Sequence, residues 1–166
     1  MEFSIRNANE SDVPGILGIV NHAILHTTAN YNYAPQLLAD QQLWFAEKTK
    51  KNNPILVADY DGKVIGFSTY GTFREKIGYQ FTVEHSVYVA DGFSGNGIGK
   101  ALLQKLISVA KEQGYHNMIG GIDASNSGSI AFHKKFGFEE CGIIKDAAFK
   151  FDRWLDLMFM QLLLDR

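Results

Sequence analysis

The stretch that decides the fold is Val87-Tyr-Val-Ala-Asp-Gly-Phe-Ser-Gly-Asn-Gly-Ile-Gly-Lys-Ala-Leu-Leu-Gln-Lys-Leu106. It predicts an apolar strand, then a turn with glycines at positions 95, 97 and 99, then a helix. Glycine lets backbone N–H groups approach a ligand without a Cβ in the way. The start of the helix adds unpaired N–H groups and a partial positive charge, so the turn is suited to phosphate. A cofactor that carries phosphate is therefore the first hypothesis.

Spacing excludes two common phosphate-binding motifs. A P-loop needs glycine, four residues, and then Gly-Lys-Ser or Gly-Lys-Thr, but Ser94 stands at the first position and Ala101 follows Gly99-Lys100. A dinucleotide fingerprint needs Gly-x-Gly-x-x-Gly, but Lys100 and Leu102 stand at the third glycine position of the two possible frames. That fingerprint also usually begins its domain, whereas this turn lies past mid-chain.

The pattern Gly95-Asn-Gly-Ile-Gly99, directly after Val-Tyr-Val, resembles the pyrophosphate loop of the GNAT superfamily of N-acetyltransferases, which bind acetyl-CoA. The superfamily loop usually begins with Arg or Gln, where this chain has Ser94. This departure removes one side-chain contact and leaves the backbone cradle. On the loop alone, a purely structural strand, turn and helix stays an alternative.

Length and composition indicate one domain over residues 1–166, large enough for a core. The net charge of −2 gives no reason to expect nucleic acid or a membrane surface as partner. The N-terminus lacks the features of a signal peptide, and no apolar run approaches a membrane span. The one cysteine, Cys141, cannot form an intrachain disulfide, which fits a cytoplasmic protein. We expect Cys141 in the core, where lone cysteines usually lie.

Periodicity predicts an α/β (α+β) domain around one central sheet. The predicted strands are 2–7, 55–60, 63–70, 81–89, 118–123, 138–149 and 154–163. The first predicted helix is capped by residues 9–12, has Pro14 in its first turn and ends at about His26, and the others are 35–51, 98–112 and 125–136. Asp61-Gly62 predicts a hairpin turn. The resemblance implies the GNAT fold, a mixed and largely antiparallel sheet of about seven strands flanked by about four helices.

The segment from Asp123 to Phe138 resembles a second motif of the superfamily, in which an Asn opens a short helix that ends in Gly-Phe. In that resemblance, Asn126 contacts the pantetheine, although an Asn at this place is also a common helix cap. His133 stands where the superfamily often has Tyr. It is a candidate acid for the leaving thiolate, and a packed structural histidine is the alternative.

Glu84 lies in a predicted strand, Thr82-Val-Glu-His-Ser-Val-Tyr-Val89. Because side chains alternate along a strand, Glu84, Ser86 and Tyr88 share one face. A carboxylate in so apolar a strand is costly unless it is used or paired. Glu84 is therefore a candidate general base, and a structural ion pair is the alternative.

The C-terminal stretch Phe149-Lys-Phe-Asp-Arg-Trp-Leu-Asp156, followed by Gln161, resembles the phosphinothricin and methionine sulfoximine acetyltransferase branch. Taken alone it predicts only a hairpin with its turn at Asp152-Arg153. Further residues agree with that branch, so the resemblance spans about residues 3 to 161: Ile19-Val-Asn-His22, Tyr31, Gly78-Tyr-Gln-Phe-Thr82 and Glu84.

This resemblance implies direct transfer of acetyl from acetyl-CoA to the α-amino group of a small glutamate-like amino acid, without a metal. An α-amino group is largely protonated at neutral pH, so Glu84, directly or through water, is the candidate base. Backbone N–H groups of residues 87–89 are candidates to stabilise the oxyanion. Members of the branch are usually homodimers, so a homodimer is expected by analogy.

The resemblance also implies two sets of binding residues. Those for CoA are Val87, Tyr88, Val89, Gly95, Asn96, Gly97, Ile98, Gly99, Lys100, Asn126 and Lys135. Those for the amine are Tyr31, Arg74, Glu75, Lys76, Glu84, His85 and Ser86. Arg74 or Lys76 is suited to a substrate carboxylate or phosphinate, although a run of charges is often a solvated loop. The functional alternatives are transfer to another amine or a protein N-terminus, and a CoA-binding module without turnover.

Overall fold

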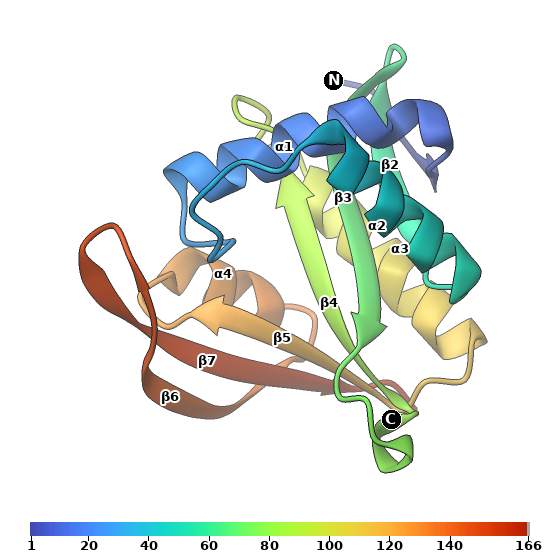
Figure 1. Cartoon of the computed structure of the whole chain (residues 1–166). Coiled ribbons are helices and arrows are strands. Elements are labelled where there is room, and N and C mark those ends of the chain that lie inside the picture. Colours follow the sequence, from blue (N-terminus) through green and yellow to red (C-terminus); the bar gives the residue numbers. More distant parts are fainter. Residues whose placement is uncertain (166) are drawn as a thin grey trace.

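The computed structural model describes residues 1–165, within which the chain forms one seven-stranded sheet and four α-helices (Figure 1). The strands are β1 (Ser4–Asn7), β2 (Ile55–Tyr60), β3 (Lys63–Thr72), β4 (Thr82–Val89), β5 (Asn117–Asp123), β6 (Glu139–Lys150) and β7 (Arg153–Leu163). The helices are α1 (Val13–His26), α2 (Leu38–Lys50), α3 (Ile98–Glu112) and α4 (Ser127–Lys134). The strand order is β1-β2-β3-β4-β5-β7-β6, and among these described strands only β4 and β5 pair in parallel. The predicted mixed, largely antiparallel sheet is confirmed.

Local sequence signals account for most element boundaries. Asp61 and Gly62 both have positive φ, as a tight hairpin turn requires, and α3 begins and ends at the predicted residues. Helix α2 begins at Leu38 rather than at residue 35, because the Asp40 carboxylate accepts the Leu37 N–H (3.1 Å) and fixes the first turn there. The last hairpin turns at Phe151-Asp152, one residue earlier than predicted, and both residues have positive φ.

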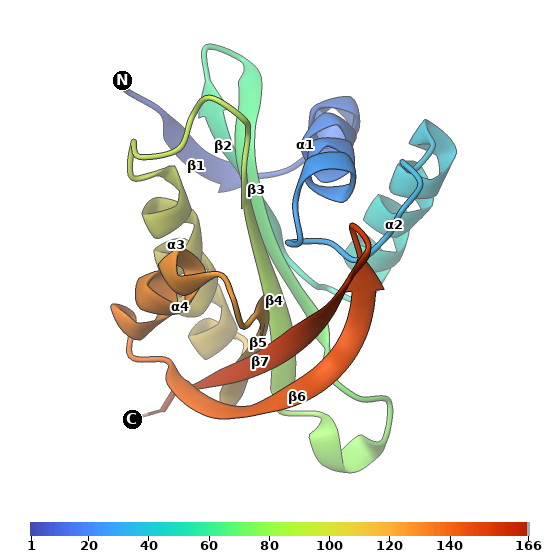
Figure 2. The same ribbon diagram turned by 90° about the vertical axis from the view of Figure 1, so that its left-hand side faces the viewer.

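The helices cover both faces of the sheet (Figure 2). Helices α1 and α2 lie over one face, and α3 and α4 lie over the other. Each face has its own apolar cluster: one contains Ile16 of α1 and Phe67 of β3, and the other contains Leu102 and Leu106 of α3. None of the helices within residues 1–165 is long and apolar enough to span a membrane.

The parallel strands β4 and β5 pair over only three residues. The pairs are Thr82–Asn117, Val83–Met118 and Glu84–Ile119, after which the strands diverge (Figure 1). Strand β4 remains paired with β3 on its other side as far as Val89. Along residues 85–89 the edge of β4 that faces β5 therefore has backbone groups without a strand partner, and these groups need another partner or water.

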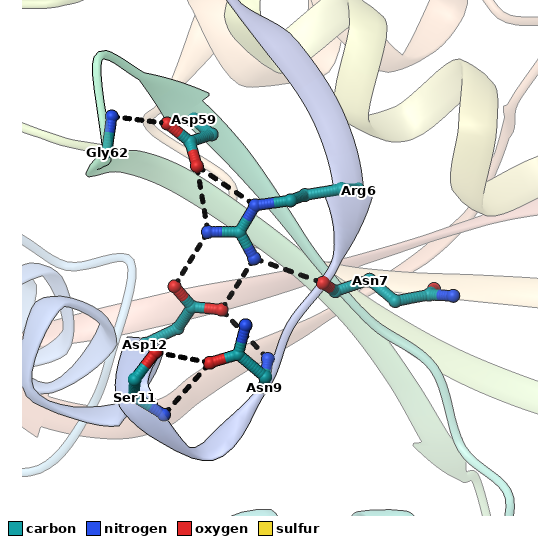
Figure 3. Close-up of polar contacts among 7 residues, drawn as sticks. All are labelled: Arg6, Asn7, Asn9, Ser11, Asp12, Asp59 and Gly62. Carbon is teal, nitrogen blue, oxygen red and sulfur yellow. Dashed lines mark hydrogen bonds and ion pairs between the residues drawn. The ribbon is translucent and has the colours of Figure 1, made fainter.

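A charged network joins β1, β2 and the start of α1 (Figure 3). The Arg6 guanidinium donates to both oxygens of Asp12 (2.7 and 2.8 Å) and to Asp59 (2.9 Å). The buried Asp12 carboxylate also accepts the Asn9 backbone N–H (2.8 Å). The hydrogen bond from Arg6 holds the pKa of Asp12 below its ordinary value, so the carboxylate is charged at neutral pH.

The expectation for Cys141 is wrong. Its side chain is exposed on β6, beside a bulge between Glu140 and Gly142, and its Sγ lies 3.1 Å from Gln161 Oε1. Strand β6 is an edge strand and most of it is exposed. The exposure of Cys141 depends on whether its strand lies at the edge or in the middle of the sheet, and the local sequence pattern does not predict the position of β6.

We expect Asp12→Asn to lower the free energy of unfolding by about 1–3 kcal/mol, because Arg6 loses a charged acceptor. The pKa of Asp12 is depressed in the folded state, so its contribution is present above the unfolded pKa and is lost as the pH falls through the folded value. The difference between wild type and variant should thus shrink below about pH 4.

Urea denaturation between pH 3 and 7 measures this difference. Asp61→Asn, at an exposed turn, is the matched control and should change the unfolding free energy by less than about 0.5 kcal/mol. Equal midpoints for wild type and Asp12→Asn at pH 7 would show that the network does not stabilise the fold.

Candidate active site

A cavity of about 1150 Å³ opens where β4 and β5 diverge. Fifteen of the predicted site residues line it: Tyr31, Glu84, His85, Ser86, Val87, Tyr88, Val89, Gly95, Gly97, Ile98, Gly99, Lys100, Asn126, His133 and Lys135. Arg74, Glu75, Lys76 and Asn96 are not among its lining residues. A smaller cavity of about 650 Å³, beside the Arg6 network, holds none of the predicted site residues.

The cavity connects the two faces of the sheet. On one face Tyr88 stacks on Phe67 (5.1 Å between ring centroids) and belongs to the apolar cluster of α1. On the other face Val83 and Val87 pack with the cluster of α3. Alternation places Glu84 on the Tyr88 face. A molecule that extends through the gap can thus lie against α3 and α4 while its end reaches Glu84.

The glycine loop has the conformation that its sequence predicts. Gly95 and Gly97 have φ of +83° and +78°, in the region that other residues rarely adopt, and Gly97 is the N-cap of α3. The N–H groups of this turn and the unpartnered edge of β4 lie in the wall of the same cavity. This arrangement fits acetyl-CoA, with the helix start for the pyrophosphate and the strand edge for an extended pantetheine arm.

Glu84 occupies the last position at which β4 pairs with β5. Its side chain is half-buried, and burial raises its pKa above the ordinary value, while the positive charge of the nearby Arg74 opposes that shift. Arg74 itself is exposed, with its guanidinium over the Phe73 ring (5.2 Å to the centroid). A carboxylate whose pKa is raised is a stronger base than a free one.

His85 and His133 form a buried pair inside the cavity wall. Their Nε2 atoms lie 2.9 Å apart, His85 Nδ1 lies 3.0 Å from the Ile119 carbonyl, and His133 Nδ1 lies 2.7 Å from the Ser129 carbonyl. Because each Nδ1 faces a carbonyl oxygen, each Nδ1 is a donor, and a hydrogen bond between the two Nε2 atoms then requires one of the rings to be protonated. All four ring nitrogens lie against a neighbouring group. Burial is the main cause that lowers the pKa of both rings. The pair joins β4 to α4, and neither ring has a free nitrogen for a ligand.

A close approach at Gly120 was not predicted from the sequence. A Cβ there would lie 2.9 Å from His85 Cε1 and 3.7 Å from His133 Nε2, so only glycine leaves room for the pair. Two consecutive glycines within a strand are a signal that could have found it. Other lining residues, which no local signal marks, are Thr28, Ala29, Phe93, Leu157 and Phe159.

Comparison with known proteins agrees with this geometry. Residues 21–138 match the acetyltransferase (GNAT) family. The chain is 48% identical to the L-methionine sulfoximine/L-methionine sulfone acetyltransferase of Pseudomonas aeruginosa over 166 residues, which cover 99% of this chain and 96% of that protein. The chain belongs to the acetyltransferase (GNAT) family. Within residues 1–165, no group of three His, Cys, Asp or Glu side chains could hold a metal ion.

Two solved structures share the fold over nearly the whole chain. An N-acetyltransferase from Staphylococcus aureus Mu50 has a TM-score of 0.97 at 45% identity, with 99% of both chains covered. A GNAT superfamily phosphinothricin acetyltransferase from Sinorhizobium meliloti, in complex with AcCoA, has a TM-score of 0.94 at 37% identity, with 98% of this chain and 89% of that one covered. The resemblance stated from the motifs is therefore confirmed for the family and the fold.

We expect Gly120→Ala to separate His85 from His133 and to lower the free energy of unfolding by about 1–3 kcal/mol, the usual range for overpacking. The matched control is Gly18→Ala in α1, where a Cβ meets nothing within 4 Å and alanine favours the helix. Thermal denaturation compares the variants, and ¹⁵N NMR of the histidine rings reports the pair directly. Wild-type stability and ring shifts in Gly120→Ala would rule out this packing.

Proposed function

We propose that this acetyltransferase moves an acetyl group from acetyl-CoA to the α-amino group of a small glutamate-like amino acid, such as phosphinothricin, methionine sulfoximine or methionine sulfone. One observation carries the proposal: the half-buried carboxylate of Glu84 lies where two parts of the cavity meet. One part, on the α3 face of the sheet, suits CoA, and the other part lies on the α1 face. The names of the relatives from Pseudomonas aeruginosa and Sinorhizobium meliloti support the choice of substrate class.

On the α3 side the chain binds and orients the acetyl donor. The N–H groups from Gly95 to Lys100 hold the pyrophosphate, and the free edge of β4 at residues 87–89 aligns the pantetheine. Asn126 and Lys135 line the same side. Acetyl-CoA supplies a thioester, which is already activated toward attack by an amine. The unpartnered N–H groups of β4 are placed to stabilise negative charge on the thioester oxygen.

On the α1 side the chain prepares the amine. Glu84, directly or through water, accepts a proton from the ammonium group so that the nitrogen can attack. Tyr31 and Ser86 line this part of the wall. Arg74 lies close enough to influence the pKa of Glu84, which suits it to pair with the carboxylate or phosphinate of the substrate. Glu75 and Lys76 follow in the same exposed loop and are proposed as outer contacts.

We propose a positioning role for His133. Donation of a proton to the leaving thiolate would require its ring to break the bond to His85 or to Ser129. The His133 ring instead keeps α4, and with it Asn126, against β4. His85 makes no hydrogen bond to the amine in this proposal and contributes only to the shape of the cavity wall.

The decisive experiment is a thiol-release assay with acetyl-CoA and a panel of amines. The panel contains phosphinothricin, L-methionine sulfoximine, L-methionine sulfone, and a peptide with a free N-terminus. We expect saturable turnover with the amino-acid analogues and none with the peptide. Turnover of the peptide alone would identify a protein N-terminal acetyltransferase. Silence across the panel, with CoA still bound in calorimetry, would indicate another amine or a module without turnover.

Glu84→Gln should lower kcat/KM by about 10²–10⁴-fold, the usual contribution of a positioned base, and leave the affinity for acetyl-CoA unchanged. The base acts when deprotonated, so wild-type activity should fall as the pH decreases through a pKa above the ordinary 4.5, and the variant should lack this limb. Glu47→Gln, on the exposed side of α2, is the matched control. Full activity in Glu84→Gln would remove the base role.

We also propose that the protein is a cytoplasmic homodimer. The edge strand β6 exposes Ile143 (50%) and Ile144 (51%), and Trp154 on β7 is 62% exposed, so the hairpin offers an apolar surface and an unpaired strand edge. An exposed thiol at Cys141 suits a reducing compartment.

Light scattering after size exclusion should give twice the chain mass for the wild type. Ile144→Glu should give a monomer, because the new charge would be buried without a partner. Lys145→Glu, on the neighbouring exposed position, should remain a dimer. A monomeric wild type would refute the dimer.

A further inference from the structure

The connection between α1 and α2 reaches across the molecule to the β6–β7 hairpin. In both views the chain after α1 passes beside the tip of that hairpin (Figures 1 and 2). Three residues of this connection, Thr28, Ala29 and Tyr31, line the central cavity together with Glu84. We call residues 27–33 the acceptor loop, because they lie on the α1 side, where the proposed amine binds.

Lys150, the last residue of β6, holds the acceptor loop. Its ammonium donates to the carbonyls of Thr27 (2.7 Å) and Asn30. These two carbonyls lie three residues apart, so a single cation fixes the curvature of the loop segment that contains Ala29. The residue is only 3% exposed, which is exceptional for lysine.

Two further bonds attach the acceptor loop to the same part of the fold. The Tyr33 hydroxyl donates to the carbonyl of Phe149, the neighbour of Lys150. The Thr28 hydroxyl donates to the Asp123 carboxylate at the end of β5 (2.5 Å). The loop is thus held at both ends and near its middle, and Tyr31 lies between these attachments.

The chemistry of the Lys150 contacts favours a positioning role over a contribution to stability alone. A buried charge is costly, and here its acceptors are backbone carbonyls instead of a carboxylate. Burial accordingly lowers the pKa of the Lys150 ammonium. A methionine would fill the same space without that cost, whereas a cation binds two carbonyls more strongly than a neutral donor does and keeps them in one arrangement. Phe149 and Lys150, two of the residues that resemble the phosphinothricin and methionine sulfoximine acetyltransferase branch, therefore both bind the acceptor loop.

We infer that Lys150 is a positioning residue for the acceptor amino acid: by binding the carbonyls of Thr27 and Asn30 it holds the acceptor loop, and Tyr31 with it, against the cavity. The inference rests on the proposed function for the identity of the acceptor. It predicts that loss of Lys150 changes the KM for the amine and leaves the KM for acetyl-CoA unchanged. The hydrogen bonds of Lys150 reach neither the glycine loop nor β4. The acceptor loop meets β4 through the Tyr88 hydroxyl, which donates to the Ala29 carbonyl (3.3 Å) on the α1 face, away from the backbone edge proposed for the pantetheine, so the affinity for acetyl-CoA should be unaffected.

The test compares Lys150→Met with Lys145→Met, a control at an exposed position of the same strand. With L-methionine sulfone as acceptor, Lys150→Met should raise the KM for the amine at least about tenfold, because a small displacement of a positioning element has effects of this size. The KM for acetyl-CoA and its dissociation constant should stay at the wild-type values. Hydrogen exchange of residues 27–33 should become faster in Lys150→Met only.

Tyr33→Phe provides a second, milder variant should Lys150→Met not fold, and it should shift the same two quantities in the same direction. Unchanged amine KM and unchanged loop exchange in the folded variants would overturn the inference. An equal rise in both KM values would overturn it as well, since it would mean general disturbance. If no amine is turned over, the proposed function fails, while loop exchange still decides whether Lys150 holds the loop.

Discussion

The separation of β4 from β5 after three paired residues is the constraint on which the rest of this structure depends. Parallel neighbours in a sheet normally satisfy each other's backbone groups, and these two do so only as far as Glu84 and Ile119. The opening leaves one edge of β4 free, connects the two faces of the sheet, and places Glu84 at the connection. A donor and an acceptor can therefore approach from opposite sides without competing for space.

Each side of this opening is stabilised by polar contacts between segments far apart in sequence. On the α3 side, the His85–His133 pair joins β4 to α4 and depends on the missing side chain at Gly120. On the α1 side, Lys150 joins the β6–β7 hairpin to the acceptor loop. Both are buried polar groups that are hydrogen-bonded, which is the condition under which such groups are tolerated. They specify one arrangement of the cavity wall where apolar packing alone would permit several.

The sequence predicted those parts of the site whose geometry follows from local rules. Positive φ at Gly95 and Gly97 and the start of α3 follow from the glycine spacing, and the face shared by Glu84 and Tyr88 follows from strand alternation. Predictions that depended on the order of the strands in the sheet were either wrong, as for Cys141, or remain untested, as for Arg74. Cys141 is exposed because β6 is an edge strand, and Arg74 lies outside the cavity wall.

By itself the sequence determined the elements, the glycine turn, the hairpins and, through its motifs, membership of the acetyltransferase family. Only the tertiary structure decided that His133 has no free ring nitrogen and that Lys150 meets carbonyls more than a hundred residues earlier in the chain. The physical reason is the distance along the chain over which each kind of interaction acts. Steric rules act between neighbours and leave a periodic pattern, whereas contacts between distant segments depend on strand order and loop closure, which no local pattern records.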